Sequence, residues 1–118
     1  MPNDFSHCVA LDSLIQSVDR VGGVEKIHLN EGDILFARTR NSTYRIRSLG
    51  GNAYEVSGGW FDKKGLSPAR TSIAGCTWGG SAIMTSLAVA TGLCIEFGNR
   101  LITSRVSTVH LIRKSRQN

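Results

Sequence analysis

The chain has 118 residues, of which 41% are hydrophobic and 19% are charged. This length fits one domain rather than two, and this balance excludes a disordered polyelectrolyte. The formal net charge of +5 permits nucleic acid or another anionic partner, but it names no activity.

The spacing of the cysteines bears on metal binding and on cellular location, and the longest uncharged run bears on membrane insertion. Cys8, Cys76 and Cys94 are widely spaced, with no CxxC pair and no histidine at metal-ligand spacing, so we expect no metal and no cofactor. This thiol content and the lack of a signal-peptide pattern predict a cytoplasmic protein. Residues 71–95 carry no charge, but their apolar part is shorter than the ~20 residues of a membrane helix, so no membrane partner is expected.

The first predicted element is a helix over residues 10–21. Apolar side chains recur there at the spacing of one helix face, at Leu11, Leu14, Ile15 and Val18. Gly22 and Gly23 then supply a helix C-cap.

From residue 25 onward, short β-prone runs alternate with glycine-containing turns. Strands are expected at residues 26–29, 34–40, 43–49, 53–57, 71–78, 93–97, 101–104 and 106–112. The last strand should be internal, because it is apolar on both faces. Residues 82–91 permit a short capped helix or a strand, and we favour the strand.

These elements predict an α+β fold that is mostly β. Short strands between turns, with one N-terminal helix, are typical of a small antiparallel barrel or sandwich. We expect a single domain over residues 9–112, a flexible N-terminus at residues 1–8 and a basic C-terminal tail at residues 113–118.

The most informative local pattern is an arginine-rich hairpin over residues 38–47. With Asn41 and Ser42 as a two-residue turn, Arg38 pairs with Arg45 and Phe36 with Arg47, and a four-residue loop is expected to keep that register. Alternation then places one set of residues toward the core, namely Leu35, Ala37, Thr39, Tyr44 and Ile46. The opposite face carries Ile34, Phe36, Arg38, Arg40, Arg45 and Arg47.

This arginine face permits two interpretations. The guanidinium groups could hold a phosphate, a carboxylate or a nucleic-acid backbone, and Phe36 could stack on a base or a flat ligand. Alternatively, the face is solvated and its charges are neutralised by distant acidic residues. The next hairpin, with a three-residue loop at residues 50–52, pairs Arg47 with Glu55 and leaves the other arginines without an acidic partner nearby in the sequence.

Two tryptophans lie beside glycine pairs, in the segments 58–61 and 78–80. Trp60, Phe61 and Trp78 could line a ligand pocket or a subunit interface, because tryptophan gives a large rigid contact area. The favoured alternative is that both indoles fill the core.

No catalytic constellation can be assembled from the sequence. Ser81 lacks the second glycine of a nucleophile elbow. Cys76 with His28 or His110 as its base is a weak candidate, and His110 in its apolar strand is better explained as a core or edge histidine. We therefore assign no catalytic residue, and an enzyme is the less favoured class.

Four segments resemble parts of a group of short, uncharacterised bacterial proteins, namely residues 32–41, 58–61, 75–81 and 96–100. The likeness spans residues 30–112, and the chain also resembles the orphan proteins encoded on integron gene cassettes. The resemblance implies no activity and no site residues. The sequence thus favours a non-enzymatic module that binds an anion, a small molecule or nucleic acid. The alternative is a self-associating interaction protein, a homo-oligomer joined through its tryptophan loops.

Overall fold

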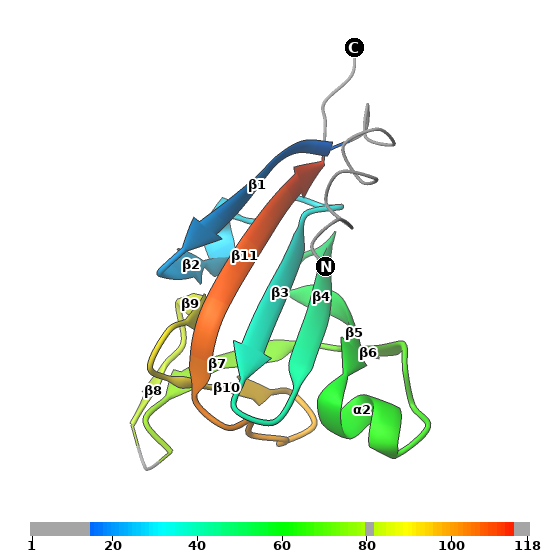
Figure 1. Ribbon diagram of the computed structural model, residues 1–118, viewed down its shortest axis with the longest axis vertical. Coiled ribbons are helices and arrows are strands. Elements are labelled where there is room, and N and C mark those ends of the chain that lie inside the picture. Colours follow the sequence, from blue (N-terminus) through cyan, green and yellow to red (C-terminus); the bar gives the residue numbers. More distant parts are fainter. Residues whose placement is uncertain (1–14, 80–81, 115–118) are drawn as a thin grey trace.

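The computed structural model describes residues 15–79 and 82–114, which form antiparallel sheets and two short helical segments (Figure 1). In chain order the elements are β1 (Ile15–Val21), β2 (Gly23–Glu25), the 3-10 helix η1 (Lys26–His28), β3 (Ile34–Thr39), β4 (Thr43–Gly50), β5 (Ala53–Gly58), α2 (Gly59–Lys63), β6 (Ala69–Thr71), β7 (Ile73–Thr77), β8 (Ile83–Met84), β9 (Leu87–Ala90), β10 (Cys94–Phe97) and β11 (Val106–Lys114). The prediction of a mostly β fold with antiparallel sheets is confirmed. Within the described residues, no helix has the length and apolar character needed to cross a membrane.

The largest sheet has six strands in the order β1-β11-β3-β4-β5-β6. Strand β11 lies between β1 and β3 (Figure 1), so the prediction of an internal strand is confirmed. Its Val109 and Leu111 side chains are buried on one side of the sheet, whereas His110 and Ile112 are half-buried on the other. This alternation gives the sheet an inner face, which packs into the core, and an outer face.

The predicted N-terminal helix is wrong where the structure describes it. Residues 15–21 form strand β1, which pairs antiparallel with β11. Without β1, the backbone groups along one edge of the apolar strand β11 would be open, so pairing with β1 satisfies them. Long-range strand pairing therefore overrides the helical spacing of the apolar residues. Residues 10–14 of the predicted helix lie outside the described residues.

Two smaller sheets cover the inner face of the six-stranded sheet. One has the order β10-β7-β8 and the other pairs β2 with β9, and Figure 1 shows β7 and β10 running across behind the large sheet. The core between these layers contains Val24, Leu35, Ala37, Tyr44, Ile46, Tyr54, Val56, Phe61, Ile73, Ala88, Val89, Ile95, Phe97, Val106, Val109 and Leu111. The sheets of the described residues do not close into a barrel, which corrects that part of the predicted fold class.

An aromatic cluster closes one end of the core. Phe61 from α2 is fully buried, and its ring centroid lies 5.3 Å from those of Trp60 and Phe97. The chain turns into α2 at Gly58, whose φ of +100° favours glycine. A Cβ atom at Gly58 would overlap the carbonyl oxygen of Thr43, so this glycine is required by the turn itself.

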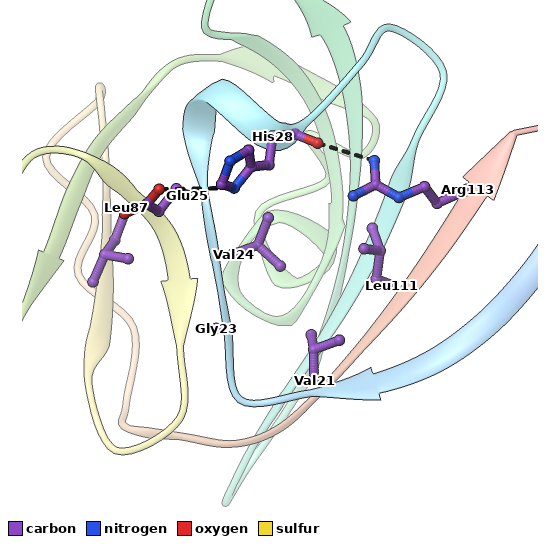
Figure 2. A pocket seen from close by; sticks show the side chains of 8 residues that line it. All are labelled: Val21, Gly23, Val24, Glu25, His28, Leu87, Leu111 and Arg113. Carbon is purple, nitrogen blue, oxygen red and sulfur yellow. Dashed lines mark hydrogen bonds and ion pairs between the residues drawn. The ribbon is translucent and has the colours of Figure 1, made fainter.

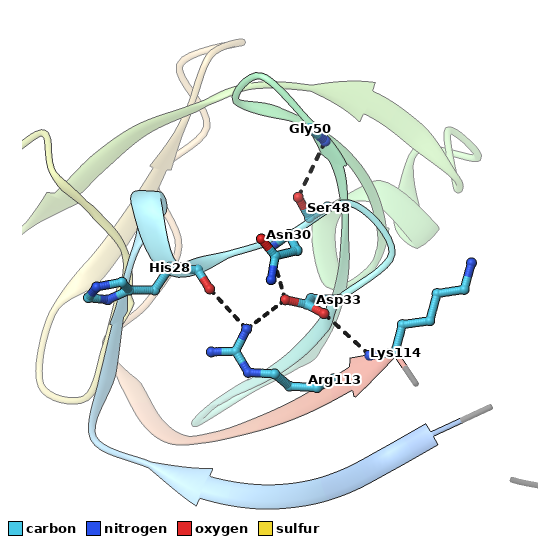
Figure 3. Close-up of polar contacts among 7 residues, drawn as sticks. All are labelled: His28, Asn30, Asp33, Ser48, Gly50, Arg113 and Lys114. Carbon is cyan, nitrogen blue, oxygen red and sulfur yellow. Dashed lines mark hydrogen bonds and ion pairs between the residues drawn. The ribbon is translucent and has the colours of Figure 1, made fainter. Parts of the chain in front are cut away.

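A buried carboxylate ties the end of β11 to the turn before β3 (Figure 3). Asp33 is 3% exposed, and its Oδ2 accepts hydrogen bonds from the Asn30 backbone N–H (2.9 Å) and from Arg113 Nη1 (2.8 Å). Its Oδ1 accepts one from the Lys114 backbone N–H (3.3 Å), while Arg113 Nη1 also donates to the His28 carbonyl oxygen (2.9 Å). A buried charge is tolerated only when it is paired and hydrogen-bonded, so these contacts fix the two segments together.

Other segments differ locally from the predicted pattern. Residues 26–29 contain η1 instead of a strand. Residues 82–91 form β8 and β9 with a turn between them, so the favoured strand is confirmed over the helix. Within the described residues, the predicted strand at 101–104 contributes an isolated bridge from Ile102 to Glu96. β11 continues through Arg113 and Lys114, which the sequence assigned to the tail, and the remaining tail and residues 1–8 lie outside the described residues.

We predict that Asp33→Ala lowers the free energy of unfolding by about 3 kcal/mol, because it leaves the Arg113 guanidinium and two backbone N–H groups without their shared acceptor. Urea denaturation followed by circular dichroism measures this change. Glu31→Ala, which removes an exposed carboxylate from the same turn, is the matched control and should stay within about 0.5 kcal/mol of the parent. Equal effects of the two substitutions would contradict the role assigned to Asp33.

Candidate functional site

The arginine-rich hairpin is formed by β3 and β4, and its loop has four residues. Arg38 pairs with Thr43, which leaves residues 39–42 in the loop. The Thr39 side chain organises this loop, because its Oγ1 accepts hydrogen bonds from the backbone N–H groups of Asn41 (3.3 Å) and Ser42 (3.1 Å). The Thr39 backbone N–H also donates to the Ser42 carbonyl oxygen at 2.8 Å. The threonine hydroxyl thus selects a longer loop than the predicted two-residue turn.

The register predicted for this hairpin is wrong, but the predicted faces are confirmed for the two strands. Arg45 lies opposite Phe36 and Arg47 opposite Ile34, two positions away from the expected pairing. A shift of two positions keeps every side chain on its original face, because side chains alternate with a period of two. The predicted core side chains are buried, namely Leu35, Ala37, Thr39, Tyr44 and Ile46. No two arginines of β3 and β4 are directly opposed, which removes the predicted like-charge repulsion.

The outer face carries a continuous row of side chains across four strands. Arg20 in β1 lies opposite His110 in β11, His110 lies opposite Phe36 in β3, and Phe36 lies opposite Arg45 in β4. Phe36, His110 and Arg45 are half-buried, and Arg20 is exposed. We call Arg20, His110, Phe36 and Arg45 the cross-strand row. It places an aromatic ring in the middle of the sheet with a cation on each side.

Arg38 adds a third cation beside this row. It is exposed and lies between Thr43 of β4 and Thr108 of β11 on the same outer face. His110, expected as a core or edge histidine, instead belongs to this face of an internal strand.

The acidic residues of the described chain neutralise only part of the arginine face. Glu55 lies opposite Arg47, as predicted, and the two side chains form an ion pair at 3.4 Å. Within residues 15–79 and 82–114, the structure shows no ion pair for Arg38, Arg40 or Arg45. Arg47 is therefore the least available of the four predicted anion ligands.

Arg40 lies apart from the strand face, in the loop at the end of the hairpin. It lines a hollow of about 390 Å³ together with Asn41, Ser104 and Arg105. Arg105 is held there by hydrogen bonds from its Nη1 to the Gly92 carbonyl oxygen (2.9 Å) and from its Nη2 to the Trp78 carbonyl oxygen (3.3 Å). Two guanidinium groups with a hydroxyl and an amide form a polar hollow that suits a phosphate or another small oxyanion.

The residues of the two glycine–tryptophan segments have different environments. Phe61, predicted to line a pocket or an interface, is fully buried in the core. Trp60 is half-buried against the core, whereas Trp78 is 54% exposed after β7. The alternative that both indoles fill the core therefore fails for Trp78.

A second hollow, of about 330 Å³, was missed by the sequence analysis (Figure 2). Its apolar lining consists of Val21, Val24, Leu87 and Leu111, with Gly23 beside them. Its polar residues are Glu25, His28 and Arg113, which come from β2, η1 and β11. These residues come from three separate parts of the chain, namely residues 21–28, Leu87 and residues 111–113, and none of them belongs to a motif, so no local sequence signal marks this hollow.

Cys76 is not placed as a nucleophile. Its side chain is fully buried, and its thiol donates to the Leu87 carbonyl oxygen at 3.9 Å. Burial raises the pKa of the Cys76 thiol to about 11, and the nearby positive charge of Lys26 offsets only part of this effect. The described residues also contain no group of three side chains that could ligate a metal ion.

Comparisons with known proteins do not add to this geometry. No protein-family model matches the chain, and no curated protein or solved structure is significantly similar to it. The resemblance to short bacterial proteins stays a prediction, and any functional proposal rests on the site itself.

We predict that Cys76 resists alkylation in the folded protein, because a pKa of about 11 leaves roughly one thiol in a thousand ionised at pH 8. The experiment uses Cys8→Ser protein, in which the remaining Cys76 and Cys94 are both buried. Iodoacetamide followed by mass spectrometry should modify Cys76 slowly in buffer and rapidly in urea. Rapid modification of Cys76 in the folded protein would show that the thiol is accessible and ionised.

Proposed function

We propose that the chain is a non-enzymatic binding module whose outer sheet face binds single-stranded nucleic acid. The observation that carries this proposal is the cross-strand row, in which Phe36 lies between His110 and Arg45 at the centre of the sheet. Arg20 extends the row at one end. Arg38 lies two residues after Phe36 in β3, and its side chain is therefore on the same outer face.

The chemistry of this row matches what single strands offer. An aromatic side chain on a sheet gives an unpaired base a surface for stacking, worth about 1–3 kcal/mol per base. Guanidinium groups on either side can donate paired hydrogen bonds to phosphate oxygens. A base inside a duplex is already stacked on its neighbours, so the central position of Phe36 favours a single strand over a double helix.

The hollow around Arg40 extends the proposed surface at the loop end of the hairpin. Thr39, the last residue of β3, pairs with Val106, the first residue of β11, so Arg40 directly after β3 and Arg105 directly before β11 lie at the same end of the sheet. A phosphate group in this hollow would meet two cations and two neutral hydrogen-bonding side chains. The proposed path of the nucleic acid therefore runs from the cross-strand row past Arg38 toward Arg40.

We predict that Arg38→Gln with Arg45→Gln weakens binding of a fluorescein-labelled oligothymidylate by at least about tenfold, because two charge-assisted phosphate contacts are lost. Fluorescence anisotropy at several salt concentrations measures this. The slope of log K against log salt should fall by roughly 0.7 for each phosphate contact removed. Phe36→Leu should weaken binding without changing that slope, because it removes stacking and no charge.

Lys63→Gln with Lys64→Gln is the matched control for the arginine pair. It removes the same charge from exposed positions at the end of α2, away from the outer face. The control should change affinity by less than about twofold, since only the general field of the protein is altered. Equal losses in both double variants, or parent protein that does not bind the oligonucleotide, would refute the proposed surface.

A second candidate function, self-association, is favoured by a specific surface feature. Trp78, Ile83 and Met84 are 54%, 38% and 41% exposed; Trp78 directly follows β7, and Ile83 and Met84 form β8, which pairs with β7. Neighbouring exposed apolar side chains of this size are typical of contact surfaces.

We predict for this candidate that the parent protein elutes as a dimer or larger species in size-exclusion chromatography with light scattering. Trp78→Ser with Met84→Ser should shift it to the monomer mass, because both substitutions remove apolar contact area from the patch. Ile27→Ser is the control, since it removes an apolar side chain that is 82% exposed on η1. A parent protein that stays monomeric at high concentration would exclude this function.

A further inference from the structure

The hollow at the loop end of the hairpin, which we call the Arg40 hollow, lies between two walls that are joined to each other. Its lining consists of Arg40 and Asn41 from the β3–β4 loop and of Ser104 and Arg105 from the segment before β11. Figure 1 shows this loop and the start of β11 at the same end of the large sheet. The Ser107 hydroxyl donates a hydrogen bond to the Arg38 carbonyl oxygen at 3.0 Å, so the two walls are fixed to one another directly beside the hollow.

Each wall is also held by hydrogen bonds of its own. In the hairpin wall, the Thr39 hydroxyl accepts hydrogen bonds from two backbone N–H groups of the loop. In the other wall, the Arg105 guanidinium donates to the carbonyl oxygens of Gly92 and Trp78. These two bonds use two of its five N–H groups, so three remain for a ligand. Arg105 is therefore held in position without being neutralised, and a group held in this way loses less conformational entropy when a ligand binds.

The charge of the Arg40 hollow favours an anion with more than one negative charge. Among the residues that the structure describes, its lining contains two arginines and no acidic side chain. The ion pairs within residues 15–79 and 82–114 involve neither Arg40 nor Arg105. A phosphodiester inside a strand carries one negative charge, whereas a phosphate monoester carries about −1.5 to −2 at pH 7. The monoester therefore matches the two guanidinium charges better than an internal phosphate does.

The position and the neutral groups of the Arg40 hollow also fit the end of a strand. The hollow lies beyond Arg38, where β3 ends and β11 begins, so the proposed path of the nucleic acid reaches it at the end of the sheet. A terminal phosphate exposes three oxygens, and the Asn41 amide and the Ser104 hydroxyl add donors to those of the arginines. The volume of about 390 Å³ is within the range of small-molecule pockets, roughly 300–1,000 Å³, so the sugar that carries the phosphate fits as well.

We propose that the Arg40 hollow binds the terminal phosphate monoester of a nucleic-acid single strand, at its 5′ or its 3′ end. This inference rests on the proposed function, because the cross-strand row holds the rest of the strand. The guanidinium groups of Arg40 and Arg105 donate to the phosphate oxygens. The protein thereby distinguishes strands that end in a phosphate from strands that end in a hydroxyl group.

The test compares three oligothymidylates of the same length, each labelled with fluorescein on an internal base so that both ends are free. One strand has a 5′-phosphate, one has a 3′-phosphate, and one has hydroxyl groups at both ends. Fluorescence anisotropy with the full-length protein measures their affinities. We expect at least one phosphorylated strand to bind about tenfold more tightly than the hydroxyl-ended strand, and the position of its phosphate identifies the end that is bound.

Two variants test whether this advantage arises in the Arg40 hollow. Arg40→Gln should reduce the difference between the phosphorylated and hydroxyl-ended strands to less than about twofold, because it removes one of the two cations. Arg40 is exposed, and the loop is held by the Thr39 hydroxyl, so this substitution leaves the hairpin intact. Lys64→Gln, the control, removes one exposed positive charge after α2 and should leave the tenfold difference unchanged.

The outcomes separate this inference from the proposed function. Equal binding of the three strands by the parent protein, or a phosphate advantage that persists in the Arg40→Gln variant, would overturn the inference. In both cases, binding of the hydroxyl-ended strand would still support the outer face as a nucleic-acid surface. Absence of binding by all three strands would refute the proposed function and this inference together.

Discussion

The structure depends on one buried carboxylate. Asp33 accepts hydrogen bonds from the turn that precedes β3 and from the last residues of β11, two segments that are 80 positions apart in the chain. This contact fixes the alignment of β11 against β3, and β11 in turn supplies the edge on which β1 pairs. The pairing of His110 with Phe36 in the cross-strand row and the position of Arg113 at the second hollow depend on that alignment.

Alternation along the strands separates the two kinds of surface chemistry. The inner face must be apolar, because it is buried beneath β7, β9 and β10, so the arginines of β3 and β4 can lie only on the outer face or in the loop. The apolar floor of the second hollow is, in contrast, formed by residues at the margin of the hydrophobic core. Val24 and Leu111 belong to the core cluster and also line that hollow. The cross-strand row and the second hollow therefore lie on opposite sides of the large sheet.

The sequence predicts the faces of the hairpin better than its register. The alternation of Leu35 and Ala37 with Phe36 and Arg38 requires only a period of two, which a shift of two positions preserves. The register depends on the loop, where hydrogen bonds to the Thr39 hydroxyl favour four residues. In the sequence, a threonine two residues before an Asn–Ser pair is compatible with either loop length. The N-terminal helix fails for a related reason, since the edge offered by β11 lies about 90 residues later in the sequence. The second hollow has no local signal because its residues meet only after the chain has folded.

The observed register also bears on how a charged face is tolerated on a stable sheet. The predicted pairing of Arg38 with Arg45 would have placed like charges directly opposite one another, which destabilises a sheet. In the structure, Arg45 lies opposite Phe36, Arg38 opposite Thr43, and Arg47 opposite Ile34. The cations of β3 and β4 are therefore separated by uncharged side chains across that pair of strands, and of the three only Arg47 forms an ion pair within the described residues, with Glu55 on β5. Because this register avoids like-charge repulsion at Arg38 and Arg45 without an ion pair to either of them within the described residues, the proposed anion-binding role of these two arginines is compatible with a stable sheet.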